Sequence, residues 1–306
     1  MVYNNILETI GNTPLVRLRK VEEKYKLNNR LFAKLESFNP TNSVKTRPAL
    51  NMFISLLEKG LINKDTKIIE STSGNTGIAL AMISAYFGNE CILVMPDTLS
   101  KERISHMALY GAKIVLTPGS IGINGARIRA IELSEKYPNS VIPSQFDNPD
   151  NPASHYLTTA NELLNDLDNI DYLFAGIGTG GTISGIGRHL KEKGLNTSVI
   201  GVEPYNSSVI NGFVKGKHKI QGIGAGFIPE NLDLDMVDQV LRVKSDEAIQ
   251  LTKELPRLEG ISAGVSSGAV LKATIDFIKE KEISYKDIVM IFPDDANKYF
   301  SLEIFD

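Results

Sequence analysis

An alternation of strand-like and helix-like runs extends along the chain and limits its fold more than any other property of the sequence. Residues 67–70 read as a strand, and the nearly all-apolar run 77–87 reads as a buried helix closed by Gly88. Further strands are predicted at 31–35, 91–95, 113–117, 172–175, 198–202 and 287–292, and further helices from 48 and at 100–110, 123–136, 153–167, 183–193, 246–258 and 266–279. Such alternation is typical of α/β proteins, in which helices cover mostly parallel sheets.

Length and composition are those of a soluble globular protein. The 306 residues suffice for two domains, and the run 147–152, rich in Pro, Asn and Asp, is the best candidate for a crossing between them. A net charge of −3, evenly spread, disfavours nucleic acid and acidic membrane surfaces as partners. Neither a signal peptide nor a membrane span is recognisable, and the one cysteine, Cys91, lies in an apolar run. We therefore expect a cytoplasmic protein with a buried thiol.

A lysine stands at a turn between a predicted strand and a predicted helix. Lys45 belongs to the polar stretch 39–47, and Pro48 fits the first turn of the helix that follows. In open α/β sheets, groups at the carboxyl ends of strands face the ligand crevice. A partly buried amine there, with a lowered pKa, forms Schiff bases with carbonyls, whereas the alternative is a solvated surface lysine.

Two other strand-to-helix turns carry groups that bind anions. The stretch 71–77 combines four hydroxyls, an amide and free helix N–H groups, which suit a carboxylate or a phosphate, although the same residues also cap helices. The stretch 176–182 is rich in glycine, so its backbone N–H groups can approach a phosphate closely. The sequence thus predicts two separate anion sites.

A dinucleotide site and a metal site are the competing interpretations. Glu203 follows the next strand and has the position of a ribose-binding acid, but the glycine spacing in 176–182 lacks the last glycine of the Rossmann fingerprint. One phosphate therefore fits better than a pyrophosphate. The histidines show no metal-ligand spacing, so no metal site is expected; they are His106, His155, His189 and His218.

A reactive lysine, a carboxylate site and a single-phosphate site together indicate pyridoxal 5'-phosphate as the cofactor. The chain also resembles the cysteine synthase (O-acetylserine sulfhydrylase) family of fold-type II pyridoxal-phosphate enzymes, with cystathionine β-synthase as a close relative. The motifs that carry the resemblance lie at 10–16, 39–40, 43–45, 72–77, 178–182, 221–229, 264–269 and 293–294. They extend over nearly the whole chain.

The resemblance implies two open twisted sheets flanked by helices, like the β subunit of tryptophan synthase, with the active site between two domains. The smaller domain would span 36–147, and the larger would combine 1–35 with 148–306. Lys45 would hold the cofactor as an internal aldimine and then remove the substrate Cα proton. The other implied cofactor ligands are Asn75, Gly178, Thr179, Gly180, Gly181, Thr182, Ser266 and Pro293, and the implied substrate ligands are Thr72, Ser73, Gly74, Thr76, Gln145, Gly222 and Asp233.

The implied reaction is β-replacement through an aminoacrylate, from O-acetyl-L-serine and sulfide to L-cysteine and acetate. Ser266 would face the pyridine nitrogen, and a hydroxyl there makes the ring a weaker electron sink than a carboxylate would, which favours elimination. A thiol or an amine is an alternative nucleophile. Alternatives are a cysteine-consuming enzyme that releases hydrogen sulfide, an O-phosphoserine-dependent synthase of the diaminopropionate branch, and a protein that keeps the fold but only binds.

The sequence departs from the family pattern at several positions that bear on the substrate. Ser71 replaces a usual proline, Thr46 an aspartate or cysteine, and Asp295 a serine. The stretch 221–235 carries three acidic residues and no arginine, which argues against a phosphorylated donor. The resemblance also implies a homodimer and, in some members, a serine acetyltransferase tail bound in the active site.

Overall fold

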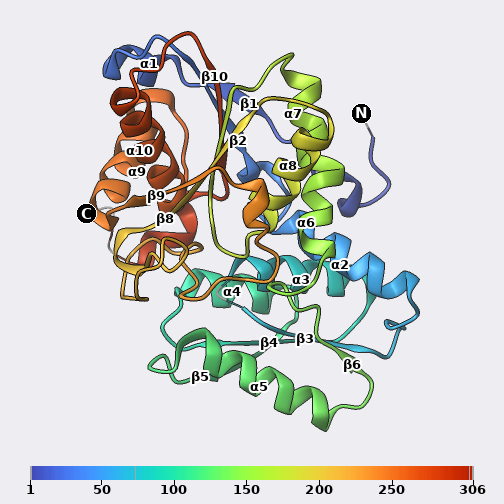
Figure 1. Cartoon of the computed structure of the whole chain (residues 1–306). Coiled ribbons are helices and arrows are strands. Elements are labelled where there is room, and N and C mark those ends of the chain that lie inside the picture. Colours follow the sequence, from blue (N-terminus) through green and yellow to red (C-terminus); the bar gives the residue numbers. More distant parts are fainter. Residues whose placement is uncertain (1, 73, 303, 305–306) are drawn as a thin grey trace.

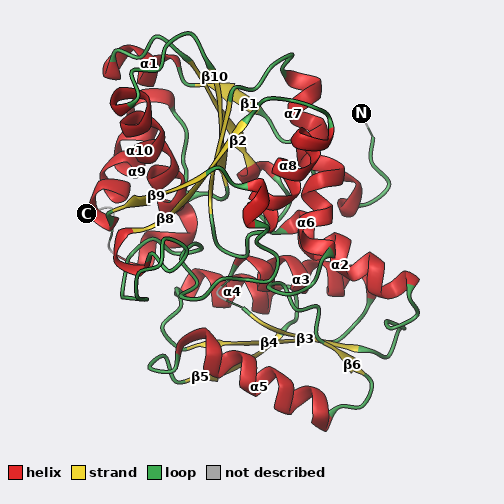
Figure 2. Ribbon diagram, in the orientation of Figure 1, coloured by secondary structure: helices red, strands yellow, loops and turns green. Residues whose placement is uncertain are grey.

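The computed structural model describes residues 2–72, 74–302 and 304. Within these residues the chain forms two sheets, one of six strands and one of four, with helices on both faces of each (Figures 1 and 2). Helices α2, α3 and α4 lie between the two sheets, and α5 covers the outer face of the smaller one. The predicted α/β class with two helix-flanked sheets is confirmed.

The larger sheet has the strand order β1-β2-β10-β7-β8-β9. The pair β1–β2 is antiparallel, and the other four neighbouring pairs of this sheet are parallel. The strand bounds are β1 Leu15–Arg17, β2 Arg30–Leu35, β7 Tyr172–Gly176, β8 Ser198–Pro204, β9 Gln239–Val243 and β10 Asp287–Phe292.

The smaller sheet is parallel throughout and has the order β5-β4-β3-β6. Its strands are β3 Lys67–Ser71, β4 Cys91–Pro96, β5 Lys113–Thr117 and β6 Ser140–Val141. Strand β4 is buried along its whole length, so its run of apolar residues does not alternate with polar ones. Cys91 begins this strand and is a buried free thiol, as predicted, and burial raises its pKa to about 12.

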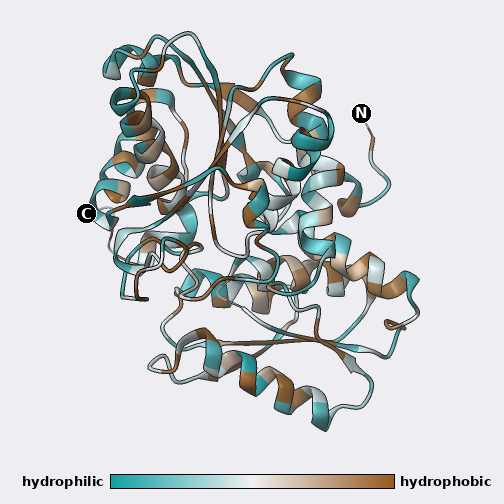
Figure 3. Cartoon of the chain, viewed as in Figure 1, coloured by the Kyte–Doolittle hydropathy of each residue, from teal (hydrophilic) through white to brown (hydrophobic). Residues whose placement is uncertain are grey.

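Four hydrophobic clusters correspond to the two faces of the two sheets (Figure 3). In β4, Leu93 and Met95 contact the cluster under α2, α3 and α4, whereas Ile92 and Val94 contact the cluster under α5. This alternation follows from the two-residue period of a strand. The helix bounds are α1 Arg19–Tyr25, α2 Thr46–Glu58, α3 Asn75–Phe87, α4 Lys101–Leu109, α5 Gly122–Lys136, α6 Asp150–Ser154, α7 Ala160–Asp166, α8 Gly181–Glu192, α9 Ser245–Glu259 and α10 Val265–Glu280.

The main differences from the sequence prediction are short elements. Strands β1, β6 and β9 and helix α1 were not expected. The single helix expected at 153–167 is divided into α6, the π-helical turn η3 His155–Thr159, and α7. The domain boundaries at 36 and 147 stay a prediction. No helix among the described residues is long and apolar enough to cross a membrane.

Candidate active site

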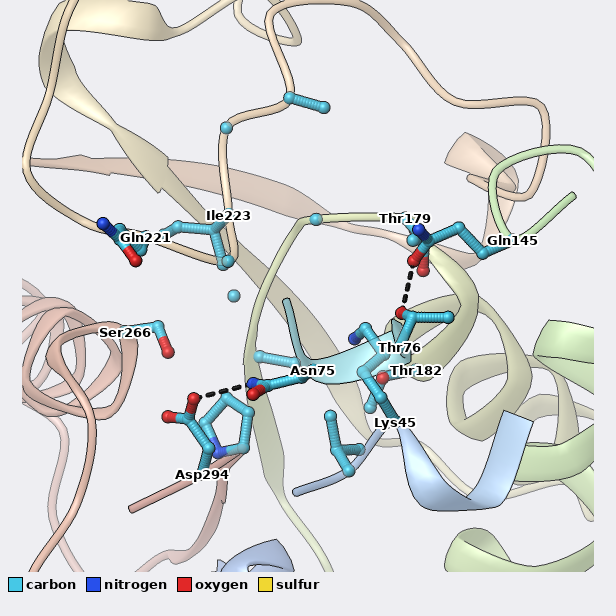
Figure 4. A pocket seen from close by; sticks show the side chains of 18 of the residues that line it. Lys45, Asn75, Thr76, Gln145, Thr179, Thr182, Gln221, Ile223, Ser266 and Asp294 are labelled. Atoms are coloured by element: carbon cyan, nitrogen blue, oxygen red, sulfur yellow. Dashed lines mark hydrogen bonds between the residues drawn. The ribbon is translucent and has the colours of Figure 1, made fainter. Parts of the chain in front are cut away.

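A cavity of about 240 Å³ collects the predicted site residues from both sheets (Figure 4). Lys45 comes from the turn before α2, Asn75 from the first residue of α3, and Ser266 from the first turn of α10. The predicted residues that line the cavity are Lys45, Asn75, Thr76, Gln145, Gly178, Thr179, Gly180, Thr182, Gly222, Ser266 and Pro293. Segments up to 255 residues apart in the sequence thus meet at one place, since Val44 and Tyr299 both line it.

Lys45 is held by its own backbone at the entry to α2. Its N–H donates to Ser43 Oγ at 3.0 Å, and the N–H of Val44 donates to the carbonyl of Pro293 at 2.8 Å. Burial lowers the pKa of the Lys45 ammonium, while the charges of Asp294 and Glu36 oppose that shift. A lowered pKa increases the fraction of free amine, which is the form that attacks a carbonyl carbon.

The residues 178–182 form what we call the phosphate cradle, at the N-terminus of α8. The N-cap residue, Gly180, has φ of 83° and no side chain with which to cap the helix N–H groups. A β-carbon there would lie 2.7 Å from Cα of Leu232, and one at Gly178 would lie 2.3 Å from the carbonyl oxygen of Gly222. Uncapped N–H groups at the positive end of a helix dipole bind an anion.

Hydroxyl groups complete the phosphate cradle. Thr179 Oγ1 accepts a hydrogen bond from Asn151 Nδ2 at 3.1 Å, and Thr182 Oγ1 lies 3.2 Å from Nε2 of the buried His155. Burial, followed by the charges of Arg47 and Lys45, lowers the pKa of His155 well below its usual value, so the imidazole is neutral. Gly181 lies outside the cavity lining, and a β-carbon there would lie 2.0 Å from Asn151 Oδ1. The residues present fit the monophosphate of the expected cofactor.

The residues 71–77 form what we call the carboxylate loop, and Ser73 lies outside the described residues. Thr76 Oγ1 donates to Gln145 Oε1 at 2.5 Å, and Gln145 Nε2 donates to the Ser71 carbonyl at 3.1 Å (Figure 4). Thr72 does not line the cavity, because its hydroxyl accepts the N–H groups of Gly74 and Gly77. Gly74, which has φ of 137°, does not line the cavity either. Thr72 and Gly74 therefore shape the loop.

A buried carboxylate, not predicted from the sequence, supports this loop. Glu70 accepts hydrogen bonds from the N–H groups of Ser71, at 2.9 Å, and of Gln145, at 3.3 Å. It therefore ties the start of the carboxylate loop to the segment that carries Gln145. Burial raises the pKa of Glu70 to about 7, against the lowering effect of these hydrogen bonds.

The structure does not bring Asp233 to the cavity. Its carboxylate pairs with Arg188 at 2.8 Å on the surface of α8, and its backbone N–H donates to Ser184 Oγ. Its side chain also accepts the N–H of Asp235. Asp233 was expected among the substrate ligands, but its contacts with Arg188 and Ser184 attach this loop to α8.

The cavity is also lined by side chains to which the sequence assigned no role, among them Asp294, Tyr299, Arg103 and Gln221. Asp294 Oδ2 accepts hydrogen bonds from Asn75 Nδ2 at 2.7 Å and from the Tyr299 hydroxyl at 2.6 Å. Arg103 lies over the Tyr299 ring at 4.9 Å and donates to Gln221 Oε1 at 2.5 Å. Because Arg103 comes from α4, the lack of arginine in 221–235 no longer argues against an anionic substituent on the substrate. A local sequence signal for this arrangement is hard to define, since it joins three distant segments.

No group of three or more His, Cys, Asp or Glu side chains able to hold a metal ion occurs in the described part of the chain. The chemistry available in the cavity is that of an amine, neutral hydroxyls and amides, the carboxylate of Asp294 and the guanidinium of Arg103. These groups suit the binding of an aldehyde, a phosphate and an amino acid.

Comparisons with known proteins find relatives of the whole chain. The family model described as pyridoxal-phosphate dependent enzyme matches residues 6–294. The chain is 45% identical to the cysteine synthase of Buchnera aphidicola subsp. Acyrthosiphon pisum, covering 99% of this chain and 98% of that one. The crystal structure of cysteine synthase from Entamoeba histolytica has a TM-score of 0.95 at 40% identity, over 100% of this chain and 91% of that one. A hydrogen sulfide-producing enzyme from Fusobacterium nucleatum has a TM-score of 0.93 at 42% identity, over 97% and 100%.

Proposed function

Because the chain belongs to the pyridoxal-phosphate dependent enzyme family, we propose that it makes L-cysteine and acetate from O-acetyl-L-serine and sulfide by β-replacement. The observation that carries the proposal is that one cavity joins Lys45, the phosphate cradle and the pair Thr76–Gln145. The cysteine synthases among the relatives, which match over nearly the full length, support the same reaction.

The proposed roles follow from where each group lies. The phosphate cradle would hold the cofactor phosphate, Asn75 would donate to the phenolic oxygen, and Ser266, at the N-terminus of α10, would face the ring nitrogen. When bound, pyridoxal phosphate supplies the electron sink that makes the substrate Cα proton acidic. Thr76 and Gln145 orient the substrate carboxylate by hydrogen bonds.

Lys45 carries the proton transfer. Its amine lies in a buried cavity, where burial lowers the pKa and favours the neutral form, while the charge of Asp294 favours the protonated form. The lowered pKa makes the neutral amine more accessible, and that is the form that removes a proton as a base. The Ser266 hydroxyl is neutral, so it stabilises a protonated ring nitrogen less than a carboxylate would. The ring is then a weaker electron sink, which favours loss of the β substituent.

The test is a product assay of the purified holoenzyme across donors and acceptors. The donors are O-acetylserine, O-phosphoserine, serine and cysteine, and the acceptors are sulfide, homocysteine, glutamate and water. We expect cysteine from O-acetylserine and sulfide to be the fastest product. Faster sulfide release from cysteine would instead identify the cysteine-consuming reaction.

Two variants at the two ends of α2 sharpen the assay. Lys45→Ala is expected to abolish both the visible absorption of bound cofactor and turnover, whereas Lys59→Ala, an exposed lysine at the C-terminus of the helix, is expected to leave both unchanged. Undiminished turnover by Lys45→Ala would refute the assignment. A protein that binds the cofactor but turns over none of the donors would support the binding-only alternative.

We also propose a homodimer, as the family resemblance implies, with a serine acetyltransferase tail as a candidate partner of the active site. Sedimentation of the purified protein tests the first point. Competition between a peptide of that tail and O-acetylserine tests the second.

A further inference from the structure

A buried lysine in the C-terminal segment holds two parts of the active site together. Lys298 lies in the 3-10 turn η6 Ala296–Leu302 and is 4% exposed. Its ammonium group donates to the carbonyls of Thr41 and Asn42, both at 2.9 Å, and to Asn75 Oδ1 at 3.0 Å. An ammonium group has three hydrogens, so all three are directed at acceptors on two distant segments.

The amide of Asn75 lies between a positive and a negative group. Its oxygen accepts from Lys298, and its Nδ2 donates to Asp294 Oδ2 at 2.7 Å (Figure 4). A flipped amide would place NH₂ against the ammonium and oxygen against the carboxylate, which would replace two charge-assisted hydrogen bonds by two repulsive contacts. The two charges therefore determine which end of the amide carries the donor hydrogens.

The Asn75 nitrogen has a second hydrogen, and Asn75 lines the cavity. In the function proposed above, this group donates to the phenolic oxygen of the cofactor. The field of Lys298 and Asp294 polarises the amide in the direction that strengthens such a donor. Neither charged side chain has to touch the cofactor to have this effect.

The other two contacts of Lys298 act on the lysine that binds the cofactor. Thr41 and Asn42 lie just before Ser43, whose Oγ accepts the N–H of Lys45. Asn42 has φ of 53°, in the left-handed region, so the turn that leads to Lys45 has a backbone conformation that needs support. The ammonium group supplies that support by binding two successive carbonyls.

We propose that Lys298 is a positioning residue that fixes the donor orientation of Asn75 and joins Asn75 to the turn that carries Lys45. The role of Asn75 toward the cofactor rests on the proposed function. The link between Asn75 and the turn that carries Lys45 rests on the three hydrogen bonds of Lys298. It follows that Lys298 acts on the electronic state of the bound cofactor through Asn75.

The test compares the visible absorption spectra of the holoenzymes of wild type, K298M, K298R and N75A. K298M removes the charge and keeps the side-chain length, so we expect a shifted absorption maximum and a kcat lowered about 10- to 100-fold, as for the loss of a charge-assisted hydrogen bond. We expect KM for the amino acid to change less than about threefold, since the carboxylate loop is not touched. K298R retains a positive charge and is expected to give a smaller spectral shift than K298M. The control is K281M, which removes an exposed lysine beyond the C-terminus of α10.

A double-mutant cycle distinguishes action through Asn75 from a general structural effect. In the N75A background, K298M is expected to add a smaller spectral shift than in wild type, because only the contacts of Lys298 with the turn that carries Lys45 are then lost. A K298M spectrum identical to that of wild type would overturn the proposal, and so would an equal shift in the N75A background. If K298M does not fold, K298R in the two backgrounds provides the same cycle. Wild-type protein that binds no pyridoxal phosphate at all would refute the proposed function instead.

Discussion

The phosphate cradle and the carboxylate loop line one cavity, but they follow strands of different sheets. Backbone packing determines the shape of the cradle, whereas side-chain hydrogen bonds determine the shape of the loop. The cradle follows β7 of the six-stranded sheet, and its shape depends on backbone that packs within van der Waals distance of neighbouring backbone. The loop follows β3 of the four-stranded sheet, and its shape depends on side-chain hydrogen bonds from Glu70, Thr72 and Gln145.

The difference corresponds to what each region has to bind. A phosphate is the same in every turnover, so a rigid arrangement of N–H groups is sufficient, and substitution of a glycine there meets backbone that cannot move. An amino-acid substrate enters and leaves, and side-chain hydroxyls and amides can adjust to it. We therefore expect substitutions in the cradle to affect cofactor affinity, and substitutions in the loop to affect KM for the amino acid.

The largest effect is expected from Gly180→Ala. The added methyl group would lie 2.7 Å from Cα of Leu232, and the residue would keep φ of 83°, which alanine disfavours. We expect the affinity for pyridoxal phosphate to fall about 100-fold or more, measured by titration of the apoenzyme, because the backbone must move to relieve the contact.

The matched control for this variant is Gly194→Ala, at the other end of the same helix. Gly194 also has positive φ, of 73°, but a β-carbon there meets no atom within 4 Å. It should lower stability by about 1 kcal/mol and leave cofactor affinity unchanged. Equal losses of affinity in both variants would show that backbone strain, and not the shape of the cradle, is responsible.

The next largest effect concerns the pH dependence of stability through Glu70. The pKa of Glu70 is raised to about 7 in the folded state, while the unfolded chain releases this proton near the ordinary pKa of 4.5. Between these values the folded state binds more protons, so the free energy of unfolding falls as pH rises, by on the order of 3 kcal/mol. Above pH 7 this contribution is constant.

Glu70→Gln removes this titration. We expect urea unfolding of the two holoenzymes between pH 4.5 and 7 to give a stability difference that changes in favour of the variant as pH rises. His155 is present in both proteins, so its contribution cancels in the comparison. A pH-independent difference would contradict the assignment, and Glu132→Gln, on the exposed face of α5, is the control.

Thr76→Val tests the substrate side of the cavity directly. The substitution removes the hydroxyl that donates to Gln145 and, in the proposed function, contacts the substrate carboxylate. Loss of a hydrogen bond to a charged group predicts a KM for O-acetylserine that is about 10- to 100-fold higher, with little change in cofactor affinity. Thr274→Val in the interior of α10 removes an equally buried hydroxyl away from the cavity and should leave KM unchanged.

The same comparison explains which parts of the site the sequence could reveal. The cradle and the loop are contiguous in sequence, because each is a strand-to-helix turn whose residues act together, and their glycines and hydroxyls are visible as local patterns. Lys45 was recognisable for the same reason. Glu70, Arg103 and Asp294 act through contacts with distant segments, and a single sequence contains no record of those contacts.

The fold shows a similar division. The interior strands β2, β3, β4, β7, β8 and β10 were predicted, because strands with a neighbour on both sides are mostly apolar, and the apolar run of the edge strand β5 was predicted as well. The missed strands β1, β6 and β9 are all at sheet edges, where they are short or alternate with polar residues. The residues of the π-helical turn η3 have an ordinary helical pattern, so its hydrogen bonding was not predictable.

The smallest effect is expected from Arg127→Met. Arg127 lies over Phe146, a residue that lines the cavity. The Arg127 guanidinium, on α5, lies 5.8 Å from the ring of Phe146 and 5.7 Å from that of Phe227, and it pairs with Asp147 at 2.8 Å. Phe146 follows Gln145 and lines the cavity, and Phe227 belongs to the loop after β8, so the contact joins the substrate side of the site to a loop of the larger sheet.

Arg127 and Asp147 are both partly exposed to solvent, which limits the contribution of these contacts to about 0.5–1 kcal/mol. Methionine keeps the apolar contact with the rings and removes the charge. We expect KM for the amino acid to rise about two- to fivefold, while cofactor affinity and the spectrum of the bound cofactor stay as in wild type. Arg129→Met, on the same helix but paired with Glu132 in solvent, is the control. If Arg127→Met changed the cofactor affinity and left KM unchanged, a substitution on the substrate side would affect cofactor binding. That result would contradict the expectation that the phosphate cradle determines cofactor affinity and the carboxylate loop determines KM.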